Sequence, residues 1–260
     1  MRRFYSIMTP PFDPLSGGIR VMYGLYGWLL AKGEVAYLNA RSDDHNFVAI
    51  YPEIYPADNP TGADVVVRYI LNRPGVMGLY GQPSPTVFSP SDKIYVFSRL
   101  YDTFRVNKNH LLFLPILNLN LFKDQGRLRS KRCVFVGKGR DLPLPYTQGL
   151  MRITKEMAYD QQALADIFNK HEAVYSFENP TAMNEIARLC GCRVIFVPEN
   201  ATIKYTLREL EEKYEPGVEG IAWGIDNDQP FDLWGFQEHY RALQKAFVRA
   251  LDRFIEDTQK

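Results

Sequence analysis

The stretch Ala173–Pro198, AVYSFENPTAMNEIARLCGCRVIFVP, decides the fold class that we predict for this chain. Its first five residues form an apolar run typical of a buried strand, and the residues after Gly191 predict a second strand. Between them we expect a helix that begins near Pro180, because Asn179 is a good N-cap and proline suits the first helical position. Gly191 is expected to end this helix. A strand, a helix and a strand in this order predict parallel pairing in an α/β sheet.

The polar residues of this stretch follow the carboxyl end of its first strand, where parallel sheets bind ligands. Glu178, Asn179 and Thr181 are therefore candidate binding residues. Free N–H groups and the positive end of the helix would attract a phosphate there. The carboxylate of Glu178 suits a neutral hydroxyl-bearing group, such as a ribose or a sugar. Phosphate and polyol together indicate a sugar nucleotide as ligand.

The composition is that of an ordinary globular protein, with 46% hydrophobic and 23% charged residues in a chain of 260. A net charge of +1 lacks the basic excess of a nucleic-acid-binding protein, so we expect no nucleic-acid partner. No apolar run approaches the ~20 residues of a membrane span. Three cysteines argue against a disulfide framework, and a cytoplasmic protein is the expectation. Cys190 and Cys192 lack the further ligands of a zinc site, so no metal is expected.

Segments typical of strands and of helices alternate along the chain, which predicts parallel sheets with right-handed crossovers. The other predicted strands are Arg3–Met8, Glu34–Ala40, Phe47–Glu53, Lys93–Ser98, His110–Ile116, Cys133–Gly137 and Gly220–Gly224. The other predicted helices are Ile19–Gly33, Ala63–Asn72, Gln161–Lys170, Lys204–Tyr214 and an amphipathic tail with an apolar stripe from Phe236 to Ile255. The polar, basic segment Asn118–Arg132 is the expected linker. We therefore expect domains 1–120 and 121–235 with a ligand cleft between them, followed by the helix 236–260.

Two glycine-containing loops follow predicted strands. Gly17 and Gly18 let the backbone approach a ligand, although this is no complete G-x-G-x-x-G motif and a plain turn is the alternative. In Val136–Arg140, Gly137 and Gly139 allow backbone N–H groups to approach an anion, and Lys138 and Arg140 add positive charge. The alternative is a charged surface turn.

Two carboxylates are candidate catalytic groups. Glu53 lies in a proline-rich loop after a predicted strand and suits a general base or a hydroxyl acceptor. Asp13, between two prolines, is the second, and turn chemistry is its alternative explanation. The basic residues Arg127, Arg129, Lys131 and Arg132 indicate either a solvated linker or a contact with anionic lipid.

Four segments carry a resemblance to bacterial glycosyltransferases of the GT-B type that assemble surface polysaccharides. They are Pro10–Val35, Tyr51–Gly75, Cys133–Arg140 and, as the most specific, Tyr175–Pro198. The resemblance implies two Rossmann-like domains facing a cleft, with the last helix crossing back onto the first domain. It also implies transfer of a sugar from a nucleoside-diphosphate donor without a metal. Lys138 and the backbone of Glu178–Ala182, including Ala182 itself, would hold the diphosphate, with Gly17 and Gly18 near the diphosphate and the sugar.

One feature departs from this family. Retaining members commonly carry two glutamates eight positions apart around the turn, whereas Glu178 and Glu185 are seven apart and Ile186 takes the place of the second. We keep Glu185 among the donor-binding candidates.

The expected activity is thus metal-independent transfer from a nucleotide sugar to a glycan or lipid-linked acceptor, with the donor as substrate and no further cofactor. Glu53 or Asp13 would deprotonate the acceptor if the enzyme inverts. We expect a cytoplasmic enzyme, with peripheral contact at the inner face of the membrane if the basic patch binds lipid. Two alternatives remain: a catalytically silent nucleotide-binding or assembly protein, and another Rossmann-like enzyme such as an epimerase or dehydrogenase, against which the missing G-x-G-x-x-G speaks.

Overall fold

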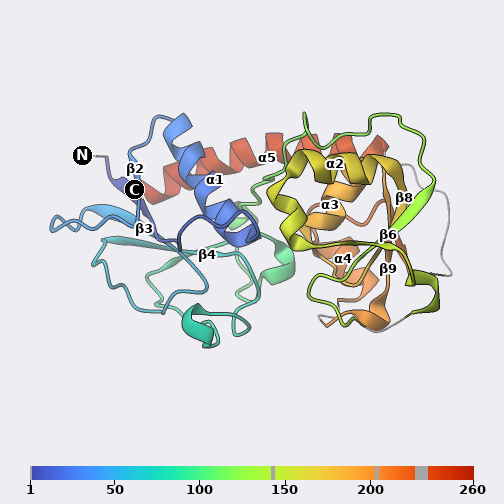
Figure 1. Cartoon of the computed structure of the whole chain (residues 1–260). Coiled ribbons are helices and arrows are strands. Elements are labelled where there is room, and N and C mark those ends of the chain that lie inside the picture. Colours follow the sequence, from blue (N-terminus) through green and yellow to red (C-terminus); the bar gives the residue numbers. More distant parts are fainter. Residues whose placement is uncertain (1, 142–143, 203–204, 226–233) are drawn as a thin grey trace. The chain divides into compact units, whose positions relative to one another are not determined.

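The computed structural model describes residues 2–141, 144–202, 205–225 and 234–260, and it divides into two compact units (Figure 1). Unit 1 comprises Met1–Ile116 with Leu243–Lys260, and unit 2 comprises Leu117–Ala242. Each unit is built on one five-stranded parallel sheet, so the predicted α/β class is confirmed.

The sheet of unit 1 has the strand order β2-β1-β3-β4-β5, with every pair parallel. The strands are β1 (Phe4–Ile7), β2 (Ala36–Leu38), β3 (Phe47–Pro52), β4 (Val65–Ile70) and β5 (Lys93–Val96). Helix α1 (Gly17–Ala31) follows β1, and Ser16 caps it by accepting a hydrogen bond from the backbone N–H of Ile19. Gly33, at a φ of +79°, ends the turn after the helix as expected.

Strand β4 corrects the sequence prediction, which made Ala63–Asn72 a helix. Three consecutive valines, Val65 to Val67, open this segment, and β-branched side chains fit a strand better than a helix. Because β4 lies between two neighbours and is covered on both faces, its residues are nearly all buried and show no polar alternation. A continuous apolar run of this length cannot be assigned from periodicity alone.

The predicted strand His110–Ile116 is also corrected. A 3-10 turn occupies Lys108–His110, and only Leu111 forms an isolated bridge, with Val96 of β5. Leu112 donates its backbone N–H to the carbonyl of Val96 at 2.9 Å, and no ladder continues beyond it within the described segment.

The core of unit 1 lies on both faces of its sheet. On one face, Val21, Leu25 and Leu29 of α1 pack together with residues of the C-terminal helix α5 (Trp234–Thr258) against the strands. On the other face, Phe47, Ala49 and Tyr51 of β3 are covered by loops. The alternating side chains of β3 therefore serve two cores, as the period of a strand requires.

The sheet of unit 2 has the strand order β10-β9-β8-β6-β7, again all parallel. The strands are β6 (Lys131–Phe135), β7 (Met151–Ile153), β8 (His171–Ser176), β9 (Arg193–Phe196) and β10 (Ile221–Trp223). The helices are α2 (Gln161–Lys170), as predicted, α3 (Ala182–Leu189) and α4 (Leu207–Lys213). Lys204, the first residue of the helix predicted around α4, lies outside the described residues. The short strand β7 was not predicted, and Lys131 and Arg132 belong to β6 rather than to the expected linker.

The predicted C-terminal helix is present as α5, and the two units share its residues. In unit 2, Phe236 and Tyr240 are buried, and the hydroxyl of Tyr240 accepts a hydrogen bond from the backbone N–H of Leu117 at 3.3 Å. In unit 1, five residues of the stripe's second half are buried in the core with α1: Phe247, Ala250, Leu251, Phe254 and Ile255. None of the helices in the described ranges combines the length and apolar character needed to cross a membrane.

Candidate functional site

The loops that follow β6, β8, β9 and β10 leave the same edge of the unit 2 sheet, because parallel strands all end at one edge. Most of the predicted binding residues lie in the first two of these loops. The structure brings the loop after β6 against the loop after β8, and ties it to the loop after β9, as the contacts below show.

Glu178 is enclosed by the glycine loop after β6. Its Oε2 accepts a hydrogen bond from the backbone N–H of Lys138 at 2.9 Å, and its Oε1 lies 3.8 Å from Lys138 Nζ. Gly137 has a φ of +54°, and a Cβ atom there would lie 2.0 Å from Glu178 Oε2. The glycine is therefore required for the loop to wrap around the carboxylate.

The same loop is fixed to the loop after β9. Arg140 donates its backbone N–H to the carbonyl of Asn200 at 2.6 Å, and Asn200 Nδ2 donates to the carbonyl of Arg140 at 3.1 Å. Thr202 Oγ1 donates to the carbonyl of Lys138 at 2.7 Å. Gly139 has no room for a side chain, because a Cβ would lie 2.4 Å from Phe177 Cβ. Backbone and side-chain hydrogen bonds thus join the loop of Lys138 and Arg140 to the loop after β9.

The start of α3 differs from the prediction. Thr181, not Asn179, is the N-cap, and Ala182 is the first helical residue, so Pro180 precedes the cap. Thr181 has an extended backbone, and its Oγ1 accepts from the N–H of Met183 at 3.5 Å. Asn179 is buried instead of capping, and the peptide bond between Asn179 and Pro180 is cis.

The buried amides beside this cap leave two atoms unpaired. Asn184 Nδ2 donates to the carbonyl of Glu178 at 2.9 Å and lies 3.5 Å from Asn179 Oδ1. Asn179 Nδ2 and Asn184 Oδ1 have no hydrogen-bond partner among the residues that the structure describes. An unpaired buried donor next to Glu178 is costly unless a ligand or water satisfies it.

Glu185 lies in the first turn of α3 and is buried, with 9% of its surface exposed. Its Oε1 accepts a hydrogen bond from the hydroxyl of Tyr214 at 2.5 Å. One turn later, the buried guanidinium of Arg188 donates to the carbonyls of Gly217 and Glu219 and lies 3.7 Å from the centre of the Phe236 ring. Burial lowers the pKa of Arg188. The carboxylate of Glu185 therefore takes part in the packing of α3 within unit 2.

A pocket of about 400 Å³, not foreseen from the sequence, opens at the ends of β9 and β10. It is lined by Phe196, Pro198, Glu199, Ala201, Tyr205, Thr206, Leu207 and Trp223. Its volume falls in the range of small-molecule sites, about 300–1,000 Å³. The signal in the sequence was Phe196 and Trp223 near the carboxyl ends of two predicted strands, with Tyr205 at the start of the predicted helix Lys204–Tyr214. Because Asn200 is hydrogen-bonded to Arg140, one loop both fixes the basic glycine loop and forms a wall of this pocket.

In unit 1, Glu53 follows β3 and is almost fully buried, with 2% of its surface exposed. Its Oε2 accepts the backbone N–H of Leu71, just after β4, at 2.7 Å. Burial raises the pKa of this carboxyl from 4.5 to about 7, and backbone N–H groups, that of Leu71 first, oppose the increase. A carboxyl that titrates near neutral pH suits a general base.

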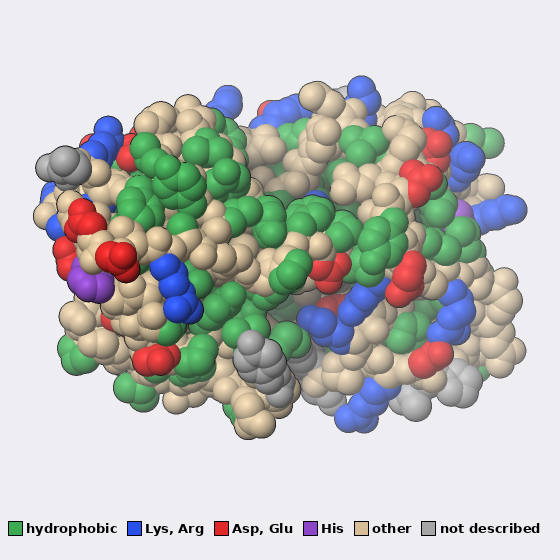
Figure 2. Space-filling model, turned by 60° about the vertical axis from the view of Figure 1, so that its left-hand side comes forward, with side chains coloured by type: hydrophobic (Ala, Val, Ile, Leu, Met, Phe, Trp, Pro, Cys, Tyr) green, Lys and Arg blue, Asp and Glu red, His purple; other side chains and the backbone are tan. Residues whose placement is uncertain are grey.

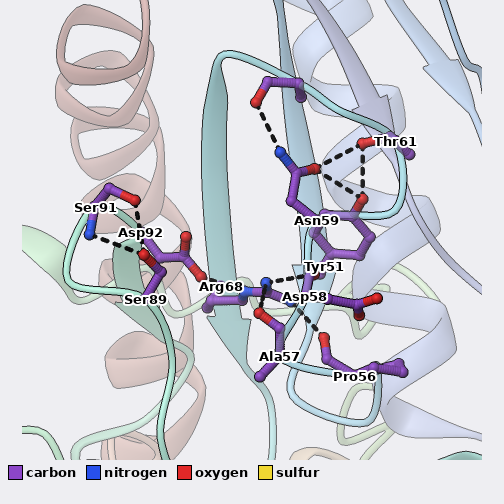
Figure 3. A network of polar contacts seen from close by, with 11 residues as sticks. Tyr51, Pro56, Ala57, Asp58, Asn59, Thr61, Arg68, Ser89, Ser91 and Asp92 are labelled. Atoms are coloured by element: carbon purple, nitrogen blue, oxygen red, sulfur yellow. Dashed lines mark hydrogen bonds and ion pairs between the residues drawn. The ribbon is translucent and has the colours of Figure 1, made fainter.

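The loop that follows Glu53 is held by Arg68 of β4 (Figure 3). Arg68 Nη1 donates to the carbonyl of Pro56, and Nη2 donates to those of Ala57 and Asp58, at 2.6–2.8 Å. Its Nε donates to Asp92 Oδ2 at 2.7 Å, and both side chains of this ion pair are buried. This network makes the proline-rich loop rigid and explains why a charged residue stands inside an apolar strand.

The other predicted residues of unit 1 lie in the loop between β1 and α1. Asp13 Oδ1 accepts the backbone N–H of Leu15 at 2.9 Å, which is turn chemistry. A Cβ on Gly17 would meet no atom within 4 Å, and one on Gly18 would lie 3.6 Å from Leu71 Cδ1. The structure therefore places Gly18 beside Leu71, whose N–H binds Glu53.

The basic residues expected to form a linker or lipid patch are largely paired. Arg127 Nη2 lies 3.3 Å from Asp166 Oδ1, and Arg132 Nε lies 2.7 Å from Glu172 Oε1. Arg129 forms an ion pair with Asp124. Elsewhere, the face drawn in Figure 2 mixes acidic and basic side chains, in keeping with the net charge of +1.

Among the described residues, no three His, Cys, Asp or Glu side chains gather as a metal site would require. The three cysteines are free and buried, and burial raises the pKa of Cys190 to about 12.

The chain matches no family model and no curated protein. Its function is therefore inferred from the geometry described above.

Proposed function

We propose that this protein is a metal-independent glycosyltransferase that moves a sugar from a nucleoside-diphosphate donor to a glycan or lipid-linked acceptor. The observation that carries the proposal is the joined site of unit 2: Glu178 accepts a hydrogen bond from the basic glycine loop, and Asn200 ties that loop to the turn that lines an aromatic pocket. Such a site offers one place for a diphosphate and another for a base. Ligand sites with a few polar groups beside an apolar pocket are typical of cofactor and substrate binding.

The binding roles follow from charge. Lys138 and Arg140 would contact the diphosphate, since both are cationic and stand in the glycine loop that Asn200 and Thr202 hold by hydrogen bonds. Asn179 Nδ2, which lacks a partner in the part of the chain described, is a further donor in the loop of Glu178. The carboxylate of Glu178 accepts from hydroxyl groups of a ribose or sugar, as predicted from the sequence.

The proposed reaction needs few groups. The acceptor hydroxyl oxygen forms a bond with the anomeric carbon of the donor, and the bond between that carbon and the diphosphate oxygen breaks. The bonding electrons leave on the diphosphate, whose charge Lys138 and Arg140 stabilise. For an inverting enzyme, a base must accept the proton of the acceptor hydroxyl; Glu53, whose pKa is raised to about 7, is the first candidate that the sequence offers for this role. Asp13 is the other candidate, and each of the two carboxylates has one oxygen that accepts a backbone N–H, that of Leu15 for Asp13 and that of Leu71 for Glu53.

The test is ligand-induced stabilisation with UDP, GDP, dTDP and NAD. A diphosphate at a hundredfold excess over its Kd raises the free energy of unfolding by about 2.7 kcal/mol. Lys138→Ala should weaken its binding about tenfold or more, because a charge-assisted contact is lost. Lys170→Ala is the matched control, since this exposed residue precedes β8 and so lies at the opposite edge of the sheet. Absence of any shift with the three diphosphates would refute the proposal, and a shift with NAD alone would favour an epimerase or dehydrogenase.

One observation favours a second candidate function, a catalytically silent nucleotide-binding protein. Glu178 already accepts the backbone N–H of Lys138, an amide that a phosphate would otherwise bind. Hydrolysis of the sugar nucleotide that matches the bound diphosphate separates the two functions. Release of free sugar at a rate that falls in the Lys138→Ala variant supports the enzyme, whereas binding without release supports the silent protein.

A further inference from the structure

The pocket at the ends of β9 and β10 has three aromatic walls. Phe196 and Trp223 pack against each other with ring centres 4.7 Å apart and planes inclined by 57°, which forms a corner. Tyr205 lines another side. Planar aromatic faces stack nucleobases favourably, whatever the base, because every base has a flat π-face. The walls alone thus favour a base without selecting one.

The polar group that could select a base is Glu199. It lies in the 3-10 turn Pro198–Asn200, contributes to the pocket lining and is exposed. Its carboxylate has neither a hydrogen bond nor an ion pair with any residue that the structure describes. The turn itself is fixed, because Asn200 donates its N–H to the carbonyl of Val197 at 3.2 Å. The carbonyl of Asn200 in turn accepts the backbone N–H of Arg140. An unpaired carboxylate is therefore held at the rim of an aromatic pocket.

We propose that this pocket binds guanine, so that the donor of the proposed glycosyl transfer is a guanosine-diphosphate sugar; the inference rests on that proposed function. An ionised carboxylate only accepts hydrogen bonds, through two oxygens. Guanine alone among the common bases presents two adjacent donors, N1–H and the N2 amino group, on its Watson–Crick edge. Uracil and thymine present one N–H between two carbonyl oxygens, and adenine and cytosine present an amino group beside a ring nitrogen acceptor.

Electrostatics sharpens the selection. A carboxylate in a site for a diphosphate repels its ligand unless both oxygens receive donors, as in a bidentate pair. A base whose carbonyl oxygens face the carboxylate adds a second repulsion, because both groups carry negative charge on oxygen. Sites built to hydrogen-bond a polar group reject analogues that lack the group far more strongly than apolar pockets reject a missing methylene. Glu199 thus both attracts guanine and excludes the other bases.

The experiment measures Kd by calorimetry for GDP, UDP, dTDP, ADP and IDP on the full chain. IDP is the sharpest probe, because hypoxanthine lacks only the N2 amino group of guanine. We expect GDP to bind about a hundredfold more tightly than UDP, dTDP and ADP, and about tenfold more tightly than IDP. Xanthosine diphosphate, which carries a carbonyl oxygen in place of the N2 amino group, should bind as weakly as UDP.

Glu199→Gln distinguishes recognition of the base from a structural role. The glutamine amide donates to the xanthine carbonyl and accepts from its N1–H, so the variant should lose GDP binding about tenfold or more and gain xanthosine diphosphate by a similar factor. Glu211→Gln, the same change on an exposed residue of α4 outside the pocket lining, should leave all constants unchanged. A general loss of stability would weaken every ligand and could not produce this exchange of preference.

The outcomes separate the two proposals. Tight binding of UDP, dTDP or ADP that Lys138→Ala weakens and Glu199→Gln does not would overturn the guanine inference while leaving the nucleotide site intact. Binding of none of the diphosphates would overturn both. Preference for GDP over IDP, together with a change of preference from GDP to xanthosine diphosphate in Glu199→Gln, establishes the inference. Comparison of GDP with GMP then shows how much of the affinity the diphosphate contributes.

Discussion

The buried carboxyl of Glu53 makes a quantitative prediction about the pH dependence of stability. Its pKa is raised from 4.5 to about 7 in the folded protein, chiefly by burial. Below about pH 4.5 the carboxyl is protonated in both the folded and the unfolded state. Between about pH 4.5 and 7 the unfolded chain releases this proton while the folded chain keeps it, so stability falls as the pH rises. At about 1.4 kcal/mol per pKa unit, the loss reaches about 3 kcal/mol by pH 8.

Glu53→Gln isolates this contribution. Glutamine has nearly the same size, its carbonyl can accept the N–H of Leu71, and it does not titrate. We expect the stability of the unsubstituted protein relative to Glu53→Gln to be constant below about pH 4.5 and to fall by about 3 kcal/mol up to pH 8. Glu211→Gln, on the exposed face of α4, is the control and should show no such pH-dependent difference.

The assay is urea unfolding followed by tryptophan fluorescence at several pH values. Unit 1 contains Trp28, whereas Trp223 and Trp234 belong to unit 2. A background with Trp223→Phe and Trp234→Phe therefore reports the unfolding of unit 1 through Trp28, which packs against Phe247. If the difference between the two proteins is the same at pH 5 and pH 8, the carboxyl is not desolvated as described. If the unsubstituted protein gains stability with pH, the surrounding N–H groups outweigh burial and the reasoning is refuted.

Two further substitutions test the loops that shape the sites. Arg68→Lys should lower the free energy of unfolding, measured with urea, by about 3 kcal/mol, because a lysine cannot replace the four hydrogen bonds of this buried guanidinium. Its control is Arg208→Lys at an exposed ion pair, which should change the same quantity by less than about 0.5 kcal/mol. Both Gly137→Ala and Gly149→Ala place a side chain at positive φ, but only Gly137→Ala drives a Cβ against Glu178, so it should cost about 1–2 kcal/mol more in the same measurement. That excess should shrink in a Glu178→Ala background without vanishing, because the same Cβ would also lie 2.8 Å from Phe135 Cε1. An equal cost of the two alanines would contradict the close contact between the loop and the carboxylate.

Local signals in the sequence were sufficient for most elements of the fold. The turn residues Gly33 and Gly191 lie at positive φ where their helices end, and α2 spans the predicted residues. The apolar stripe of the tail is a helix for the same reason, since its 3.6-residue period is set by the chain itself. The alternation of strands and helices also indicated the parallel α/β class, because parallel strands need long crossovers.

The prediction was wrong where neighbours rather than local pattern decide the structure. Apart from Arg68, β4 is apolar on both faces because β3 and β5 flank it and cores cover it, and no period in Ala63–Asn72 records this. Likewise Thr181 displaces Asn179 as the cap of α3, and Asn179 is buried beside Asn184 instead.

The candidate site divides in the same way. The sequence alone placed Lys138 and Glu178 after strands of one parallel sheet, since both follow apolar runs with loop residues behind them. Only the tertiary structure decided that the Glu178 carboxylate binds the Lys138 amide, that Asn200 ties Arg140 to the wall of an aromatic pocket, and that Glu53 loses its contact with water. Periodicity and turn chemistry act over a few residues, whereas these contacts join segments far apart in the chain, and the desolvation that raises a pKa exists only once those segments have packed.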